Sequence, residues 1–415
     1  MKIVQICTGF DISYNGGITN YVRNISESLI DQGNEVTVIY SNNEGSSKNY
    51  KFKTIPVDTK MRAFGLSSVI TNRDIIKLER IINKENPDII HVHMMIDLPI
   101  MVLEMFKRHA KLVISLHDYY YICNRIILIK SDGSNCIDSD ENKLCNFCIN
   151  NHELIDNRIL RFLYKRLQNF FFKKSVSPSS GHNERFKVGR KLFKDADLLI
   201  AVSNRVKEIY QKSGYNNDYF VVNHIGNYTA EDNFRKLFFG RKVKDVNDII
   251  RFGFIGNLNY HKGSKILLEL INETKNDFHI YGRISPDVLE EISSNVNVKY
   301  HGEYNHSELP RILKHIDFGL VLPIWEDNAP QVIFEFLNAG IPIIGTNKGG
   351  LPDFIDDTNG KLFGVDEVIE MKKFINSPEL IIFYNKVINS IKGTKKANEH
   401  SNELLGLYNN LNLLC

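Results

Sequence analysis

Residues 323 to 340 of the chain read Pro323-Ile-Trp-Glu-Asp-Asn-Ala-Pro-Gln-Val-Ile-Phe-Glu-Phe-Leu-Asn-Ala-Gly340. A short apolar run at residues 318–322 comes directly before this stretch and predicts a buried strand. Apolar positions at helical spacing predict a helix over residues 331–338, and the apolar run at 341–344 predicts the next strand. Strand, loop, helix and strand in this order form a Rossmann-type unit, in which ligands lie beyond the carboxyl ends of the strands.

The same alternation continues in both directions along the chain. In the first half, strands are expected at residues 2–8, 35–40, 87–93, 112–116, 197–202 and 220–223, with helices from Gly17 to about Gly33 and over 74–83 and 99–108. In the second half, strands are expected at 250–255, 278–281 and 296–300, with helices over 264–272 and 306–315. A polar, charged break at 229–247 separates the two alternations and indicates a domain boundary.

We therefore predict an α/β protein with two Rossmann-like, doubly wound domains and a cleft between them. The predicted domains are residues 1–228, on the side of an acceptor, and residues 229–394, which hold a nucleotide. A C-terminal helix within residues 395–415 is expected to return to the first domain.

The overall composition excludes several classes of protein. The 52 basic and 49 acidic residues give a net charge of +3, which argues against a dedicated nucleic-acid binder. The first residues do not resemble a signal peptide, and no apolar run is long enough for a transmembrane helix. We therefore expect a cytoplasmic protein whose thiols are reduced.

Two glycine-containing loops follow predicted strands. Gly16 and Gly17 open the first helix, either as a tight turn or as a loop that lets a diphosphate approach the positive helix end. In the second half, residues 252–263 contain a strand, a glycine-rich loop and then Lys262-Gly263. Lys262 is either a solvated surface lysine or a cation for a leaving diphosphate.

The stretch 323–340 also carries two acids in suggestive positions. Asp327 is expected in the loop, and Glu335 about one turn inside the helix that begins near Gln331. This arrangement offers carboxylates to hydroxyl groups and free helix amides to a phosphate. The loop after the next strand contains a second glycine pair, Gly349-Gly350.

Taken in order along the chain, these motifs resemble the family-4 retaining glycosyltransferases, which have the GT-B fold. The shared motifs are the first glycine pair, His117-Asp118, Ala196-Asp197 with Ser203, Lys262-Gly263, the Asp327 to Glu335 stretch, Gly340-Ile-Pro342 and Gly349-Gly350. The resemblance covers nearly the whole chain, and it implies metal-independent transfer of a sugar from a UDP- or GDP-linked donor to an acceptor hydroxyl.

The resemblance also implies roles for individual residues. Glu335 would bind the donor ribose, Asp327 would face the hydroxyls of the transferred sugar, and Lys262 would contact the diphosphate. His117, followed by Asp118, would project into the cleft near the sugar and the acceptor. The remaining donor-side residues would be Gly16, Gly17, Asn257, Asn328, Gln331 and Val332.

The chain departs from the family pattern at three positions. Asp327 stands where the family usually has Glu, and the neighbouring Glu326 is a candidate to replace it. Asn257 stands where the family usually has Arg, so one of two cations on the diphosphate is missing. Pro330 has no N–H group, so phosphate amides would come from Gln331 and Val332. The alternative function is therefore a catalytically weak partner subunit that binds a nucleotide-sugar.

Four cysteines lie in or at the edge of a polar insertion at residues 119–150. Cys145 and Cys148 have the spacing of a zinc knuckle, and Cys123 and Cys136 would complete a structural site with four thiolates. The alternatives are unpaired loop cysteines, or a disulfide if the compartment is oxidising.

A basic segment follows the cysteines. Residues 158–194 contain eleven Lys or Arg residues and a single acid, Glu184, and residues 158–174 interleave bases with bulky apolar side chains. One interpretation is a core-facing helix with a solvated basic face. The other is a helix that docks on an anionic membrane at its cytoplasmic face, where a lipid-linked acceptor would be reached.

Overall fold

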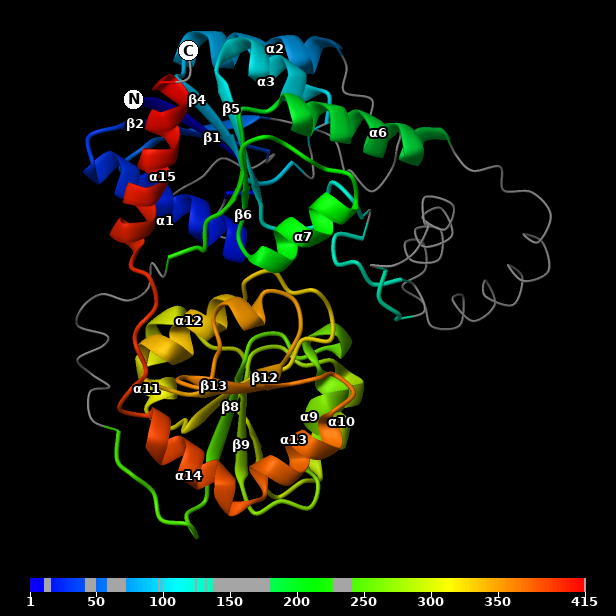
Figure 1. Cartoon of the computed structure of the whole chain (residues 1–415), viewed down its shortest axis with the longest axis vertical. Coiled ribbons are helices and arrows are strands. Elements are labelled where there is room, and N and C mark those ends of the chain that lie inside the picture. Colours follow the sequence, from blue (N-terminus) through cyan, green and yellow to red (C-terminus); the bar gives the residue numbers. More distant parts are fainter. Residues whose placement is uncertain are drawn as a thin grey trace, which may run out of the picture. The chain divides into compact units, whose positions relative to one another are not determined.

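The computed structural model describes residues 1–10, 16–41, 50–57, 72–95, 98, 100–123, 125–130, 133–136, 180–226 and 241–413. Contacts between Cα atoms divide the chain into two compact units, which are coloured along the sequence in Figure 1. Unit 1 comprises Met1–Ala201, Lys207–Val222 and Leu407–Cys415, and unit 2 comprises Val202–Val206 and Asn223–Gly406.

Unit 1 is built on a parallel sheet. Its strands are β1 (Lys2–Thr8), β2 (Glu35–Ser41), β3 (Lys53–Val57), β4 (Ile89–Val92), β5 (Lys111–Leu116), β6 (Leu198–Ala201) and β7 (Phe220–Val222). Among the described residues, they form a seven-stranded sheet in the order β3-β2-β1-β4-β5-β6-β7. The helices in this part of the chain are α1 (Gly17–Asp31), α2 (Asn72–Glu85), α3 (Val102–His109), α6 (Ser180–Asp195) and α7 (Asn204–Lys212). Central strands such as β1 are apolar almost throughout because helices cover both faces of a doubly wound sheet.

Unit 2 contains the second parallel sheet. Its strands are β8 (Arg251–Ile255), β9 (Asp277–Tyr281), β10 (Val298–Tyr300), β11 (Phe318–Val321), β12 (Ile343–Thr346) and β13 (Gly360–Phe363). In the described part of the chain they form a six-stranded sheet in the order β10-β9-β8-β11-β12-β13. The helices are α9 (Ser264–Ile271), α10 (Pro286–Ser293), α11 (Leu309–Leu313), α12 (Gln331–Asn338), α13 (Val368–Ile375), α14 (Pro378–Val387) and α15 (Ala397–Leu413).

Two apolar clusters lie on the two faces of the unit 2 sheet. On one face, alternate side chains such as Phe252 and Phe278 pack with α9, α10, α13 and α14. On the other face, Ile255, Tyr281 and Val321 pack with α11 and α12. The period of two along each strand therefore assigns successive side chains to different helix layers.

The order of the six strands in unit 2 matches that of the first six strands in unit 1, and the two parallel sheets confirm the predicted α/β fold with two doubly wound, Rossmann-like sheets. In each sheet the strand order reverses at a pair of central strands, β1 with β4 and β8 with β11. Loops at the carboxyl ends of such a pair splay apart and leave room for a ligand. The edge strands β3 and β13 were not predicted, because a half-exposed strand such as β3 lacks the continuous apolar run of a central strand.

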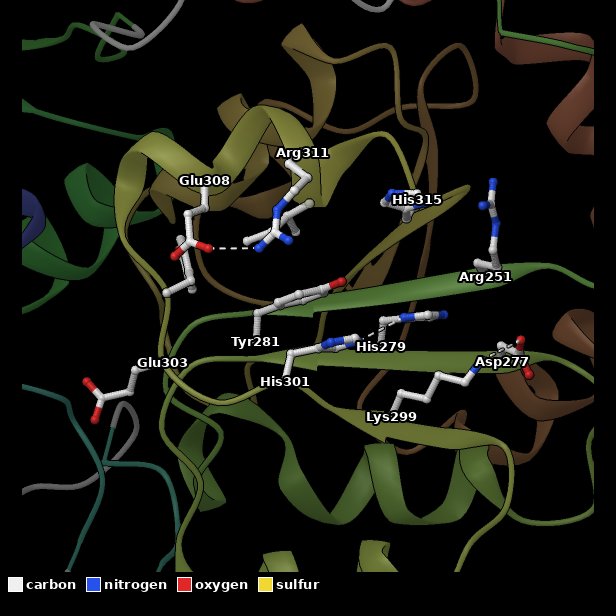
Figure 2. A pocket seen from close by; sticks show the side chains of 12 residues that line it. Arg251, Asp277, His279, Tyr281, Lys299, His301, Glu303, Glu308, Arg311 and His315 are labelled. Atoms are coloured by element: carbon white, nitrogen blue, oxygen red, sulfur yellow. Dashed lines mark hydrogen bonds and ion pairs between the residues drawn. The ribbon is translucent and has the colours of Figure 1, made fainter.

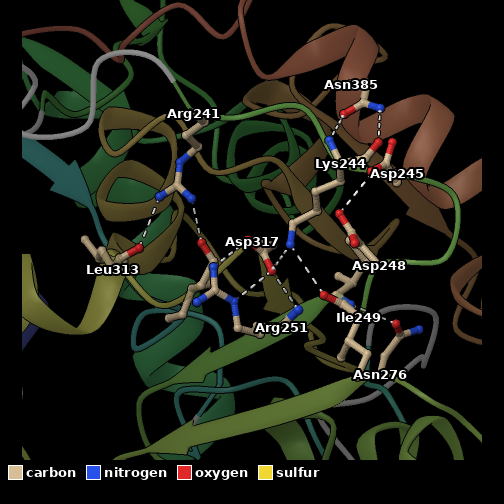
Figure 3. A network of polar contacts seen from close by, with 12 residues as sticks. Arg241, Lys244, Asp245, Asp248, Ile249, Arg251, Asn276, Leu313, Asp317 and Asn385 are labelled. Carbon is tan, nitrogen blue, oxygen red and sulfur yellow. Dashed lines mark hydrogen bonds and ion pairs between the residues drawn. The ribbon is translucent and has the colours of Figure 1, made fainter.

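A buried charge network ties the amino-terminal ends of β8 and β11 together (Figure 3). The Asp317 carboxylate, which is 2% exposed, accepts hydrogen bonds from the Arg251 guanidinium at 2.9 and 3.0 Å. Lys244 Nζ lies 3.1 Å from the same carboxylate. Burial raises the pKa of Asp317, but hydrogen bonds from Arg251 and the charge of Lys244 outweigh it and lower the pKa. Asp317 is thus shared between two cations, Arg251 and Lys244.

The last helix, α15, has residues in both units, and its final turns belong to unit 1. There, the Tyr408 hydroxyl lies 2.6 Å from Nδ1 of His91, whose Nε2 is 2.7 Å from the Ser115 hydroxyl. Among the helices of the described residues, none has the length and apolar character needed to cross a membrane.

Candidate functional site

A pocket of about 250 Å³ lies at the point in unit 2 where the strand order reverses. Its walls come from the carboxyl ends of β8 and β11, the loops that follow them and the first turns of α12. Six of the residues predicted to bind a donor line this one pocket: Asn257, Lys262, Asp327, Gln331, Val332 and Glu335.

Lys262 reaches this pocket because the loop after β8 folds into a short turn. The Asn259 side chain accepts a hydrogen bond of 3.1 Å from the Lys262 amide and so caps the 3-10 turn Tyr260–Lys262. Gly263 then has a φ of +89°, and a Cβ atom there would lie 2.0 Å from the Leu322 carbonyl oxygen. Only glycine permits this approach between the loops after β8 and β11. Gly263 is thus required by the backbone geometry, and Lys262 supplies the charge.

Lys262 and Asp327 form an ion pair across the pocket. Lys262 Nζ lies 2.5 Å from Asp327 Oδ2, with side-chain exposures of 33% and 10%. Lys262 Nζ also lies 5.4 Å from the centre of the Trp325 ring. An anion that enters the pocket would compete with Asp327 for the ammonium group.

The second glycine pair holds the Asp327 loop in place. The Gly350 amide donates a 2.7 Å hydrogen bond to the Asp327 carbonyl. A Cβ atom at Gly349 would lie 2.1 Å from that carbonyl oxygen, and one at Gly350 would lie 2.0 Å from the Asn328 carbonyl oxygen. Any larger residue would displace the acidic loop, so the glycine pair acts by supporting Asp327. Asn328 itself is buried and does not line the pocket.

Glu326, the candidate replacement for Asp327, is turned away from the pocket. Its side chain is 1% exposed, and its oxygens lie 2.9 Å from Arg205 Nε and 2.7 Å from Lys348 Nζ. Burial raises the pKa of Glu326, but hydrogen bonds from Arg205 and Lys348 outweigh it and lower the pKa. Glu326 is therefore an ionised residue that anchors the loop, and Asp327 is the acid that lines the pocket.

Glu335 lies on α12, which begins at Gln331 as the sequence predicted. Its side chain is 13% exposed, and its Oε1 lies 3.8 Å from Nε2 of His306. The interaction with the Glu335 carboxylate raises the pKa of His306 despite partial burial. Tyr304 lines the same pocket, and burial followed by the charge of Glu335 raises the pKa of its hydroxyl.

Sequence reasoning missed Tyr304 and His306. Both follow β10, at the same carboxyl edge of the sheet as the predicted residues. Their position after a predicted strand could have indicated them, because loops at the carboxyl edge of such a sheet usually bind the ligand.

The first turn of α12 faces the pocket with Gln331 and Val332. Its N-cap residue is Pro330, which makes no side-chain hydrogen bond to the helix. A helix start without a side-chain cap offers its amides and the positive end of its dipole to an anion.

In unit 1, Gly16 is the N-cap of α1 and Gly17 is its first residue, and both are exposed. A Cβ atom at Gly16 would meet no atom within 4 Å, so this position leaves open space above the helix start. The backbone at Gly16, with a φ of −71°, does not itself demand glycine.

His117 follows β5 and belongs to a chain of polar contacts. Its Nε2 lies 3.1 Å from His93 Nδ1, and His93 Nε2 lies 2.5 Å from the Gln5 side-chain oxygen. The Tyr21 ring lies with its centre 4.8 Å from that of His117. Burial lowers the pKa of His117 to about 3, so the imidazole is neutral at physiological pH. Sequence reasoning missed His93 and Gln5, which looked like interior residues of apolar strands.

Asp118 has a local structural role. Its Oδ1 accepts a 2.9 Å hydrogen bond from the Tyr120 amide, and its carbonyl accepts a 2.7 Å hydrogen bond from the Tyr210 hydroxyl. The carboxylate thus caps the turn after β5 and positions the loop that carries His117.

The predicted zinc ligands are only partly described. Cys123 is buried and Cys136 is half-buried, whereas Cys145 and Cys148 lie outside the described residues. The basic segment 158–174 also lies outside them.

Comparisons with known proteins match both halves of the chain. Residues 15–226 match Glycosyltransferase Family 4, and residues 250–376 match Glycosyl transferases group 1. An uncharacterized 42.6 kDa protein in the cps region of Klebsiella pneumoniae is 22% identical, over 89% of this chain and 98% of the relative.

Solved structures of similar architecture cover the whole chain. HepE from Anabaena, in complex with UDP and glucose, has a TM-score of 0.62 at 14% identity, with 99% of each chain covered. The lipopolysaccharide outer core galactosyltransferase WaaB has a TM-score of 0.62 at 13% identity, over 99% of this chain and 100% of the other. At these identities the similarity establishes a shared fold.

Proposed function

The chain belongs to the family-4 glycosyltransferases, and we propose that it moves a sugar from a nucleoside-diphosphate donor to an acceptor hydroxyl with retention of anomeric configuration. The observation that carries this proposal is the unit 2 pocket, where Lys262, Asp327, Glu335 and the start of α12 line one cavity. Such a cavity combines groups for a diphosphate with carboxylates for hydroxyls.

In this proposal the donor lies along the pocket. The ribose hydroxyls bind Glu335, the diphosphate meets Lys262 and the amides of Gln331 and Val332, and the sugar hydroxyls face Asp327. Asn257 also lines this pocket, and its uncharged amide would donate hydrogen bonds to the diphosphate. The UDP complexes of the structurally similar HepE support a UDP-linked donor, and a GDP-linked donor is the other candidate.

Catalysis would rest on stabilising the leaving group. Breaking the anomeric bond builds negative charge on the departing diphosphate, and Lys262 with the helix amides is arranged to receive it. These cationic and dipolar groups are the basis for proposing metal-independent chemistry. The leaving phosphate would accept the proton of the acceptor hydroxyl on the same face of the sugar, which retains the configuration.

An inverting reaction is less compatible with this site. Inversion needs a general base whose pKa lies near the working pH. His117 was the best base candidate, and burial lowers its pKa to about 3. A neutral His117 is better suited to donate or accept a hydrogen bond near the sugar or the acceptor.

A second candidate function is a partner subunit that binds a nucleotide-sugar without transferring it. Two observations favour it: Asn257 replaces a cation, and Lys262 is already paired with Asp327. Donor hydrolysis by the pure protein separates the two functions, because an enzyme would release nucleoside diphosphate slowly without acceptor.

We propose an acceptor of surface polysaccharide or lipid-linked oligosaccharide synthesis, at the cytoplasmic face of a membrane. The relative in the cps region and the structural similarity to WaaB support this acceptor class. The basic segment 158–174 would supply attraction to anionic lipid. A structural zinc on Cys123, Cys136, Cys145 and Cys148 is part of the proposal, and elemental analysis should then find about one zinc per chain.

The decisive experiment measures the binding of UDP-glucose, UDP-galactose and GDP-mannose by calorimetry, with wild type and Glu335→Ala in parallel. We expect one donor to bind wild type and to bind the variant about tenfold or more weakly. The anomeric configuration of the product is then read by NMR with a lipid-linked acceptor extract. A protein that binds none of the donors contradicts the proposal.

A further inference from the structure

A second pocket in unit 2, of about 360 Å³, lies over the face of β8, β9 and β10 beside α11 (Figure 2). Tyr281, His279 and His301 form its floor, and their rings are stacked on one another at interplanar angles of 5° and 10°. Figure 2 shows Arg311 and Glu308 on the helix side and Arg251 at the far end of the strands. A cavity of this size can hold a small organic ligand.

One buried polar atom in this floor has no partner. His279 is 9% exposed, and its Nδ1 lies 3.0 Å from Nε2 of His301. The other ring nitrogen of His279, Nε2, is buried and makes no hydrogen bond within the described structure. A buried polar atom without a partner costs about 1–3 kcal/mol, which a ligand hydrogen bond would remove.

Three permanent cations line the pocket: Arg251, Lys299 and Arg311. Arg251 pairs with Asp317, which is shared with Lys244, and Arg311 Nη2 lies 2.8 Å from Glu308 Oε1 in an exposed ion pair. Lys299 lies 3.7 Å from Asp277, with the lysine 56% exposed, which is a weak pairing. The neighbouring cations contribute, after burial, to the lowered pKa values of His279 and His301.

Three acids and a phenol accompany these cations. Asp277, Glu303 and Glu308 line the same pocket, and the Tyr281 ring belongs to its floor. Cations suit a phosphate group, whereas carboxylates and a phenol suit sugar hydroxyls. A ligand with both kinds of group matches this mixed lining better than a bare anion does.

We propose that this pocket binds a hexose phosphate, with the phosphate toward the cations and the sugar over the ring stack. The site is separate from the donor pocket, since Tyr304 is the one residue common to both linings among the described residues. It extends beyond the transferase function proposed above, and its occupancy does not depend on that function.

The test is calorimetric titration of the full-length protein with hexose 1-phosphates, hexose 6-phosphates, the free hexoses and inorganic phosphate. We expect at least one hexose phosphate to bind about tenfold more tightly than either inorganic phosphate or the free hexose. Arg311→Ala and His279→Phe should each weaken that binding by about fivefold or more. Arg311 is an exposed residue of α11, so its variant is expected to fold normally even if His279→Phe does not.

Two matched variants locate the ligand. Glu335→Ala removes a carboxylate of the donor pocket. Lys372→Ala breaks the ion pair between Lys372 of α13 and the exposed Glu273, and neither of these two residues lines either pocket. Both variants should bind the hexose phosphate as wild type does. Loss of binding in Glu335→Ala with full binding in Arg311→Ala would assign the ligand to the donor pocket and overturn the proposal. Equal affinity for inorganic phosphate, or no binding at about 10 mM of any hexose phosphate, would overturn it as well.

An NMR titration supplies a readout specific to the site. In the ligand-free protein, burial together with His301 and the cations Lys299 and Arg251 lowers the pKa of His279 to about 4. A bound phosphate would favour the protonated ring and raise this pKa. An unchanged His279 titration in the presence of saturating ligand contradicts binding in this pocket.

Discussion

Six strands of the unit 1 sheet repeat the order of the six strands of the unit 2 sheet, yet the side chains that follow their central strands differ in chemistry. In unit 2 the reversal between β8 and β11 is charged, with Lys262 paired to Asp327 and Glu335 nearby. In unit 1, His93 and His117 follow β4 and β5 and contact each other, and burial lowers the pKa of His117 so that its ring is neutral. The shared backbone topology therefore provides a ligand site at the carboxyl ends of the strands, and the side chains around that site determine which ligand charge it can bind.

The groups that line the unit 2 pocket can stabilise a charge, whereas His93 and His117 in unit 1 can supply neutral hydrogen bonds. A charged substrate group gains from cations and helix amides in the unit 2 pocket. In unit 1, burial lowers the pKa of His117, so its neutral ring can exchange hydrogen bonds without adding a charge.

The largest effect is expected for Lys262→Ala. If Lys262 stabilises the negative charge on the leaving diphosphate, this interaction strengthens as the anomeric bond breaks. The variant should then have a lower kcat, equivalent to about 2–4 kcal/mol of added activation free energy. Steady-state kinetics at saturating donor measures this kcat. Asn257→Arg in the same background should restore part of the loss if the guanidinium reaches the same phosphate. Normal kcat with a raised KM would mean that Lys262 binds substrate and transition state equally.

A smaller effect is expected for Glu335→Ala. The variant loses a charge-assisted hydrogen bond, so donor binding should weaken by about 1.5–3 kcal/mol with a smaller change in kcat. Calorimetry measures the affinity, and Glu335→Gln serves as the control that keeps shape and removes charge. Unchanged donor affinity in both variants would contradict a contact with the ribose.

His93→Phe tests the neutral group in unit 1. The change removes the contact to His117 Nε2 while it keeps an aromatic side chain, so His117 loses one of the contacts that orient its ring. We expect kcat to fall about tenfold with donor affinity unchanged, because the proposed donor pocket is lined by unit 2 residues. A matching loss of donor affinity would show that the substitution disturbs the fold more widely.

The smallest effect concerns pH and His306. Its pKa is raised by Glu335, so this pair stabilises the fold fully below the unfolded-state pKa of histidine, and the contribution is lost as pH rises through the raised pKa. The melting temperature of His306→Gln should therefore fall further below wild type at pH 5.5 than at pH 8.5, by about 1 °C or less. His315→Gln is the control, because it also replaces a histidine with glutamine but leaves the pair of His306 and Glu335 in place. An identical difference at both pH values would contradict the pairing.

Much of the fold could be predicted because its signals are local. The apolar runs of β1 and β5 and the helical spacing of α12 depend on neighbours in sequence, and these elements lie where the patterns indicated. Edge strands such as β3 carry weaker patterns, since one side of the strand has no strand neighbour and much of its surface remains exposed.

The candidate site was predictable to a similar degree. Lys262 follows β8, and Asp327 and Glu335 follow β11, its neighbour in the sheet. Parallel strands joined by helices have their carboxyl ends at one edge of the sheet. That rule explains why residues far apart in sequence share one pocket. It does not say which way each side chain turns.

The amino-acid sequence by itself determined the two doubly wound sheets and the loops that carry the site, because hydrophobic period and glycine spacing act over a few residues. Only the tertiary structure decided that Asp327 and not Glu326 faces the pocket, because Arg205 and Lys348 hold Glu326 from distant parts of the chain. It also decided that His117 is neutral, since burial beside Tyr21 and His93 sets that pKa. Side-chain direction and protonation follow from such long-range neighbours, and spacing along the chain does not encode them.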